Sequence, residues 1–219
     1  MARLPPTLLL IRHAEPMPQS VDGAEENERG LSEKGLRDAD EIARCFANSK
    51  LRAIYSSPYP RARQTVAPLA KRHRLEIKII NDLCERTLSP EPLPDWGLHL
   101  RRAWADFDYA LPGGESSRAA QARIVRVLAN IKAKHGIPFR RLIRSASRRV
   151  VNKRRAVCEV GGPRDGIVAV ARHGDLISLA LNSFCAAVDF NFWAAMPFPA
   201  VYQLESTGDG WRIVSGPGF

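Results

Sequence analysis

The stretch Thr-Leu-Leu-Leu-Ile-Arg-His, residues 7–13, sets the interpretation of the whole chain. Its first five residues form a continuous apolar run of strand length, which is typical of a strand buried on both faces by helices in a parallel sheet. Arg12 and His13 follow directly at the carboxyl end of this run. The stretch therefore predicts a buried strand that delivers a guanidinium and an imidazole to one edge of a sheet.

The pattern of a strand followed by a helix repeats along the chain. Residues 51–55 and 167–171 are further apolar runs of strand length, and Ser32 offers an N-cap for a helix with one apolar face. Other strands are expected at residues 77–80, 201–204 and 211–214, and other helices at residues 62–70, 96–107, 116–135 and 176–184. This alternation favours an α/β fold: a three-layer, open, mostly parallel sheet with helices on both faces.

The composition predicts a single domain over residues 1–219, because the chain can bury one substantial core and shows no linker-like break. Without a secretory signal, or an apolar run near the roughly 20 residues that cross a bilayer, we expect a cytoplasmic protein with no transmembrane segment. The scattered cysteines fit packing roles in a reducing compartment. Neither they nor the five histidines show metal-site spacing, so we expect no metal and no cofactor.

Polar residues follow the ends of several predicted strands. Open α/β sheets bind ligands beyond the carboxyl ends of their strands, which brings Arg12, His13, the loop 56–61, Glu85 and His173 to one edge. An arginine fork matches phosphate oxygens in geometry and charge, and a neutral imidazole is a competent nucleophile toward phosphorus. Nearby arginines lower the pKa of an imidazole and keep it neutral. The edge therefore predicts a phosphoryl-transfer site.

Six segments, in chain order, resemble the motifs of the histidine phosphatase superfamily, which includes cofactor-dependent phosphoglycerate mutases and a branch of broad-specificity phosphatases. They are similar to its Arg-His-Gly, Leu-Thr-x-x-Gly, Ser-Ser-Pro-x-x-Arg-Ala-x-x-Thr, Leu-x-Glu, Gly-Gly-Glu-Ser and second His-Gly motifs. The segments are Arg12-His13-Ala14-Glu15, Leu31-Ser32-Glu33-Lys34-Gly35, Ser56-Ser57-Pro58-Tyr59-Pro60-Arg61-Ala62-Arg63-Gln64-Thr65, Leu83-Cys84-Glu85, Pro112-Gly113-Gly114-Glu115-Ser116 and Arg172-His173-Gly174. The resemblance extends from about residue 7 to residue 204, and it implies the phosphoglycerate mutase-like fold.

The resemblance also implies a role for each site residue. His13 is the nucleophile and carries the phosphoryl group as a phosphohistidine, while Glu85 protonates the leaving oxygen and later takes a proton from water. His173 is a catalytic residue that also helps to bind the phosphate. The residues expected to bind phosphate are Arg12, Arg61, His173 and Gly174.

The chain departs from the family pattern at two motif positions. Ala14 replaces the usual glycine, and Arg172 stands where a small residue is common, so Arg172 either points away from the site or adds a phosphate contact. Three further acids lie in loops that can compete with Glu85 for the proton-donor role. These acids are Glu91, Asp95 and Glu115.

Three functions are compatible with these residues. The loops 16–29 and 86–111 are shorter than the mutase versions that enclose a bisphosphate, which favours a phosphatase that hydrolyses phosphomonoesters without a metal. The alternatives are a phosphoglycerate-type phosphomutase and a non-catalytic phosphate-binding or polyanion-binding protein of the same fold. We expect a phosphorylated small molecule as the substrate, with phosphate as a product.

A basic insertion occupies about residues 136–166, where the family usually has a short turn. Within it, residues 140–155 supply eight arginines and lysines with no acid among them, and without those eight charges the formal charge of +10 falls to +2. The apolar residues inside it recur at helical spacing, which predicts either a solvated surface helix or a helix that docks on an anionic partner. Unchanged binding to polyanions after deletion of residues 136–163 would exclude the docking alternative.

Overall fold

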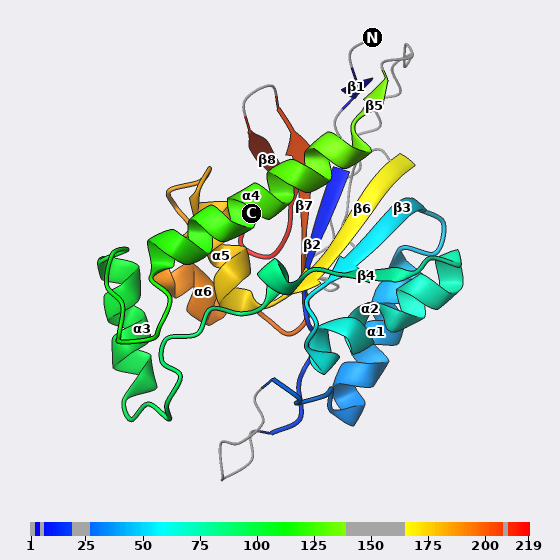
Figure 1. Cartoon of the computed structure of the whole chain (residues 1–219). Coiled ribbons are helices and arrows are strands. Elements are labelled where there is room, and N and C mark those ends of the chain that lie inside the picture. Colours follow the sequence, from blue (N-terminus) through cyan, green and yellow to red (C-terminus); the bar gives the residue numbers. More distant parts are fainter. Residues whose placement is uncertain (1–2, 5–6, 19–26, 139–164, 208–209) are drawn as a thin grey trace.

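A computed structural model describes residues 3–4, 7–18, 27–138, 165–207 and 210–219. A six-stranded sheet, with strand order β4-β3-β6-β2-β7-β8, lies at its centre (Figure 1). Its strands are β2 (Thr7–Arg12), β3 (Lys50–Ser56), β4 (Ile77–Ile79), β6 (Asp165–Arg172), β7 (Ala200–Ser206) and β8 (Trp211–Ser215). The predicted α/β fold is confirmed.

The sheet is parallel over four strands and antiparallel at one side. β4, β3, β6 and β2 run in the same direction, whereas β7 pairs antiparallel with β2, and β8 antiparallel with β7. The direction of the last two strands could not be obtained from their apolar patterns. The short connection between Ser206 and Trp211 explains why β8 is antiparallel to β7, because it is too short for the crossover that a parallel pair requires.

Helices cover both faces of the sheet, so the three-layer arrangement is also confirmed (Figure 1). The helices are α1 (Glu33–Cys45), α2 (Pro60–His73), α3 (Trp96–Ala105), α4 (Ser117–His135), α5 (Gly174–Asn182) and α6 (Phe190–Ala195), with a 3-10 turn, η1 (Asn81–Leu83), before α3. Predicted residues 96–107 form a helix only to Ala105, because Asp106 has extended backbone angles.

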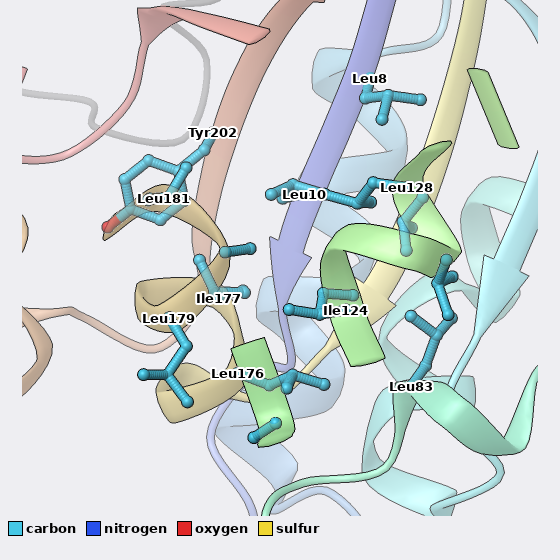
Figure 2. Close-up of a cluster of buried hydrophobic side chains, with 14 of the residues drawn as sticks. Leu8, Leu10, Leu83, Ile124, Leu128, Leu176, Ile177, Leu179, Leu181 and Tyr202 are labelled. Atoms are coloured by element: carbon cyan, nitrogen blue, oxygen red, sulfur yellow. The ribbon is translucent and has the colours of Figure 1, made fainter. Parts of the chain in front are cut away.

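Two apolar cores explain why β2 is a continuous apolar run. Successive residues of a strand point to opposite faces. Leu9 and Ile11 pack in the cluster that α1 and α2 cover, while Leu8 and Leu10 pack in the cluster that α4 and α5 cover. Figure 2 shows the second cluster, in which Leu8 and Leu10 lie with residues of α4 and α5. Each fully buried leucine stabilises the fold by about 2 kcal/mol.

The Leu-Ser-x-x-Gly segment attaches α1 to the chain that leaves β2. Ser32 caps the helix by accepting a hydrogen bond from Gly35 N at 3.0 Å, and its hydroxyl donates to Glu15 Oε1 at 2.9 Å. A Cβ at position 35 would lie 2.1 Å from the Glu15 carbonyl oxygen. Only glycine permits that approach, so this motif has a structural role beside the predicted site.

The expected basic insertion is described only at its two ends. β5 (Ile137–Pro138) follows α4 and pairs antiparallel with β1 (Arg3–Leu4), and Asp165 already belongs to β6. The predicted basic helix lies outside the described residues, as does Cys158. Among the described helices, none is long and apolar enough to cross a membrane.

One interpretation of the cysteines is wrong. Cys84 and Cys185 are free thiols, as expected, but Cys45 is disulfide-bonded. Spacing along the chain identifies short-range cysteine motifs, and it carries no information about which thiols a fold brings together.

Candidate active site

The carboxyl ends of three adjacent parallel strands, β3, β6 and β2, lie side by side at the edge where the site is predicted. β2 and β6 end in register at Arg12 and Arg172, and His13 N donates to the Arg172 carbonyl oxygen at 2.9 Å. Ser57 N donates to the Ala171 carbonyl oxygen at 3.0 Å, which brings the end of β3 to the same edge. The rings of His13 and His173 consequently lie edge to face, with 5.2 Å between their centroids.

His13 is held as one tautomer. Its Nδ1 lies 2.8 Å from the Ala14 carbonyl oxygen, and a carbonyl can only accept, so the proton is on Nδ1. Nε2 therefore keeps its lone pair. His13 is 5% exposed, and this burial disfavours the charged, protonated form of the imidazole.

The turn after His13 is connected to the beginning of α2. Ala14 N donates to Thr65 Oγ1 at 2.9 Å, and the Thr65 hydroxyl donates to the Arg61 carbonyl oxygen at 2.7 Å. Ala14 is fully buried, so a methyl group is accommodated where the family usually has glycine. These bonds fix the distance between the imidazole turn and the segment that carries Arg61.

His173 is the N-cap of α5 and is almost fully buried. Its Nε2 lies 2.9 Å from Ser57 Oγ, while its Nδ1 has no hydrogen-bond partner in the part of the chain that the structure describes. A Cβ on Gly174 would lie 2.9 Å from Arg12 Cζ, so glycine is required for Arg12 to pack there. The arrangement gathers an unpartnered imidazole nitrogen, a helix N-terminus and a guanidinium, which together suit an anion.

Arg12 is packed more tightly than the sequence suggested. Its Cζ lies 3.5 Å from the centroid of the Phe198 ring, and Nη1 donates to the Met196 carbonyl oxygen. Phe198 also contacts His13, with 5.2 Å between ring centroids, and it is 38% exposed. Its ring therefore shields the His13 imidazole and the Arg12 guanidinium from solvent, a contact that no motif around residue 198 indicated.

Burial and neighbouring cations keep both histidines neutral. Burial lowers the pKa of His13 to about 3, against the Ala14 hydrogen bond, which favours the charged form. The guanidinium groups of Arg61, Arg12 and Arg29 act in the same direction as burial. Burial, and then the neighbouring His13, likewise lowers the pKa of His173 well below its usual range. Both imidazoles are therefore neutral near pH 7.

This electrostatic state predicts how stability depends on pH. Because both folded pKa values lie below the ordinary value of 6.5, the unfolded chain binds more protons as the pH falls below 6.5. The stabilisation is complete above pH 6.5 and is lost as the pH falls toward about 3. Between pH 6 and 5 each histidine is expected to remove about 1 kcal/mol from the unfolding free energy.

Urea unfolding at the two pH values, on the wild type and on a His13→Asn, His173→Asn double variant, measures this loss. The wild type is expected to lose about 2 kcal/mol more than the variant, because asparagine does not titrate there. Equal losses in the two proteins would show that these histidines are not held neutral.

Glu85 lies at the beginning of α5, the helix that His173 caps. Its Oε2 accepts from Asp175 N at 3.1 Å, and its Oε1 accepts from Leu176 N at 3.1 Å and from Arg86 N at 2.9 Å. The residue is partly exposed. Oε2, with one backbone donor, retains capacity for a proton.

The other candidate acids are placed differently. Glu115 binds Arg123 through two bonds, at 2.6 and 2.8 Å, and Arg123 also donates to the carbonyl oxygens of Asp82 and Cys84. This contact explains the Gly-Gly-Glu-Ser segment: it fixes the chain directly before Glu85. Glu91 and Asp95 are exposed. Glu85 is therefore the carboxylate that the structure ties to the helix of His173.

Sequence reasoning missed several residues around the site. Arg172, whose role was open, is fully buried and donates from Nη2 to the Leu176 carbonyl oxygen at 2.5 Å, so it supports the first turn of α5. Ser57 contacts His173, and Arg29 contributes to the electrostatics of His13. Ser57 belongs to a recognised segment, whereas no sequence signal pointed to Arg29.

Comparisons with known proteins identify the fold and the family motifs. Residues 8–137 match the family model described as the histidine phosphatase superfamily (branch 1). No curated protein sequence matches the chain. The structure of mycobacterial glucosyl-3-phosphoglycerate phosphatase shares 22% identity, with a TM-score of 0.68 and 98% of each chain covered. The structure of the same protein in complex with inorganic phosphate shares 23% identity, with a TM-score of 0.64 and 95% of each chain covered.

A mutase structure shares the same fold. Phosphoglycerate mutase from Bacillus anthracis is 15% identical, with a TM-score of 0.65, and the match covers 98% of this chain and 93% of the mutase. At these identities the structural likeness establishes the fold and leaves the reaction to be argued from the site.

Proposed function

The chain belongs to branch 1 of the histidine phosphatase superfamily, and we propose that this phosphatase hydrolyses phosphomonoesters through a phosphohistidine formed on His13. The observation that carries the proposal is the state of His13, a buried neutral imidazole whose Nδ1–H is bound to the Ala14 carbonyl. Nε2 then has a lone pair available near neutral pH. Such an imidazole needs no separate base to become a nucleophile.

The first step transfers the phosphoryl group to the protein. The Nε2 lone pair attacks phosphorus, the bond between phosphorus and the ester oxygen breaks, and Glu85 gives a proton to the departing oxygen. Its place at the beginning of α5 supports Glu85 in this role. The products of this step are an alcohol and a phosphohistidine.

The second step restores the free enzyme. A water oxygen attacks phosphorus while the Glu85 carboxylate takes a proton from that water, and the bond between phosphorus and Nε2 breaks. Nε2 regains its lone pair, and phosphate leaves. One carboxyl group thus serves as the acid in the first step and as the base in the second.

The phosphate oxygens are proposed to bind Arg12, Arg61, His173 and Gly174. Their placement supports this: Gly174 is the first residue of α5, and His173 Nδ1 has no partner among the described residues. Both arginines lower the pKa of both histidines through their charge. Preorganised donors of this kind stabilise the charge that develops on phosphate oxygens in the transition state.

Removing one such donor has a predictable cost. Arg61→Ala is expected to lower kcat/KM by about a hundredfold or more, because a buried guanidinium fork is lost. Arg61→Lys is expected to recover only part of the loss, since an ammonium cannot make a two-pronged contact. Steady-state phosphate release measures both variants. Arg63→Ala, an exposed arginine two residues further along α2, serves as the matched control and should retain full activity.

The experiment that tests the function is phosphate release from a panel of phosphomonoesters in the presence of a metal chelator. The panel contains p-nitrophenyl phosphate, sugar phosphates and a glycosylated phosphoglycerate, the last because a structural neighbour is named for that ester. Metal-independent release supports the proposal. A folded protein that releases no phosphate but interconverts phosphoglycerates would favour the phosphomutase alternative instead.

Two earlier expectations also stay proposals. A cytoplasmic location is supported by the sequence alone. Docking of an anionic partner is motivated by the eight uncompensated basic residues within residues 140–155. The deletion described above tests the second of these.

A further inference from the structure

The carboxylate of Glu85 is fixed by backbone donors from two separate segments. One donor comes from the chain that follows η1, and the other two come from the first turn of α5. The three bonds hold the carboxylate in place only while these segments keep their relative position. The side chains that join the segments therefore determine where the proton donor lies.

A buried ion pair joins the two segments. Arg86, the residue after Glu85, and Asp175, the residue after Gly174, approach to 2.8 Å, and their side chains are 0% and 8% exposed. Trp104 of α3 donates its indole N–H to Asp175 Oδ1 at 2.9 Å. Arg86 Nη1 donates to Ser117 Oγ of α4 at 2.5 Å. Both charges are thus held by neighbouring helices as well as by each other.

Substrate binding and stability alone do not explain this pair. The Arg86 side chain has no exposed surface, so its cation is not available to a phosphate. Burial raises the pKa of Asp175, and the Arg86 cation and the Trp104 N–H oppose that rise. A buried ion pair often stabilises a fold no more than apolar side chains of the same volume. Its location beside both Glu85 and α5 gives it another use.

We propose that Arg86 and Asp175 are positioning residues, whose ion pair fixes the start of α5 against the Glu85 segment and so directs the Glu85 carboxyl group to the leaving oxygen. This inference rests on the proposed function, in which Glu85 is the proton donor. Proton transfer requires hydrogen-bond reach, and a displacement of about 1 Å lowers a rate by about a hundredfold. The pair therefore matters most when the leaving oxygen needs a proton.

Two substrates of different leaving-group ability test the proposal in Asp175→Asn. p-Nitrophenolate departs without protonation, whereas the alcohol of an alkyl phosphate does not. We expect kcat/KM to fall at least about tenfold for the alkyl phosphate that the wild type hydrolyses fastest, and less than about threefold for p-nitrophenyl phosphate. In a Glu85→Gln background, Asp175→Asn should cause no further loss with the alkyl ester.

Equal losses with the two esters, or an undiminished loss in the Glu85→Gln background, would overturn the positioning role. If Asp175→Asn does not fold, Trp104→Phe decides, because it keeps the ring and removes only the indole donor. In Trp104→Phe, kcat/KM should fall about threefold more for the alkyl phosphate than for p-nitrophenyl phosphate. Trp96→Phe, an exposed tryptophan on the same helix, is the matched control and should change neither substrate.

The wild type separates the two possible failures. If it hydrolyses p-nitrophenyl phosphate but Asp175→Asn and Trp104→Phe show no selectivity, the positioning proposal alone is wrong. If the folded wild type hydrolyses no ester, the proposed function is wrong, and this inference is wrong with it.

Discussion

His13→Ala is expected to abolish phosphate release, with kcat lowered on the order of 10⁵-fold, the scale at which enzymes lose activity when their nucleophile is deleted. The reason lies in the Nε2 lone pair, which the Ala14 hydrogen bond and the low pKa keep available. His173 engages Ser57 through its Nε2, so its ring is held in a different contact from that of His13. Initial rates of phosphate release from the best substrate of the panel measure the loss.

A second readout tests the intermediate itself. Wild-type protein mixed with an aryl phosphate labelled on phosphorus and quenched in alkali is expected to retain label on histidine, since phosphohistidine survives base and is hydrolysed by acid. His13→Ala should retain none. His73→Ala, at the far end of α2, removes a histidine that contacts the Phe46 carbonyl and should behave as the wild type. Full activity in His13→Ala would contradict the mechanism.

The apolar runs predicted the fold because strand β2 is buried on both faces. Burial on both faces leaves a continuous apolar segment, and that pattern can be read without knowledge of the neighbouring helices. The parallel strands then place Arg12, His13 and His173 at one edge by geometry alone. The edge strand β4, only partly buried, carries a weaker pattern, and the antiparallel pairing of β7 and β8 left no mark on theirs.

The motifs predicted a set of site residues but did not distinguish residues proposed for the chemistry from residues that support the fold. Gly35 permits close contact with Glu15, and Glu115 holds Arg123 against the chain before Glu85, so both motifs are structural at this site. The ion pair between Arg86 and Asp175 was not predictable, because 89 positions separate the two residues and no sequence pattern around either one indicates that they pair. Contacts of that kind arise only when the helices dock.

The position of Phe198 against His13 and Arg12 was also not predictable from the sequence. A single phenylalanine between two prolines is compatible with a core residue, an interface or a loop. In the structure it covers both His13 and Arg12 and remains partly exposed. An aromatic ring therefore lies against both the imidazole and the guanidinium, a contact that only the folded chain reveals.

Glu85→Gln is the variant that isolates proton transfer. Loss of the general acid is expected to lower kcat/KM for an alkyl phosphate by about 10²- to 10³-fold, because the alkoxide must then leave unprotonated. For p-nitrophenyl phosphate kcat/KM should change little, since that ratio reports the step in which the nitrophenolate departs. The pattern across the two esters distinguishes loss of the acid from general damage to α5, which would affect both.

Glu85 is also the proposed base of the second step, so Glu85→Gln should lower kcat for the aryl ester even though kcat/KM for that ester changes little. Without a base to take the proton from water, phosphohistidine hydrolysis slows, so kcat should fall while the first turnover stays fast. A burst of nitrophenolate, equal in amount to the enzyme, is the expected result in stopped-flow measurements. Glu91→Gln, which changes an exposed acid in the following loop, should show neither effect. If Glu91→Gln rather than Glu85→Gln produced the burst, the acid and base role would belong to that loop, and the backbone bonds of Glu85 would serve only to cap α5.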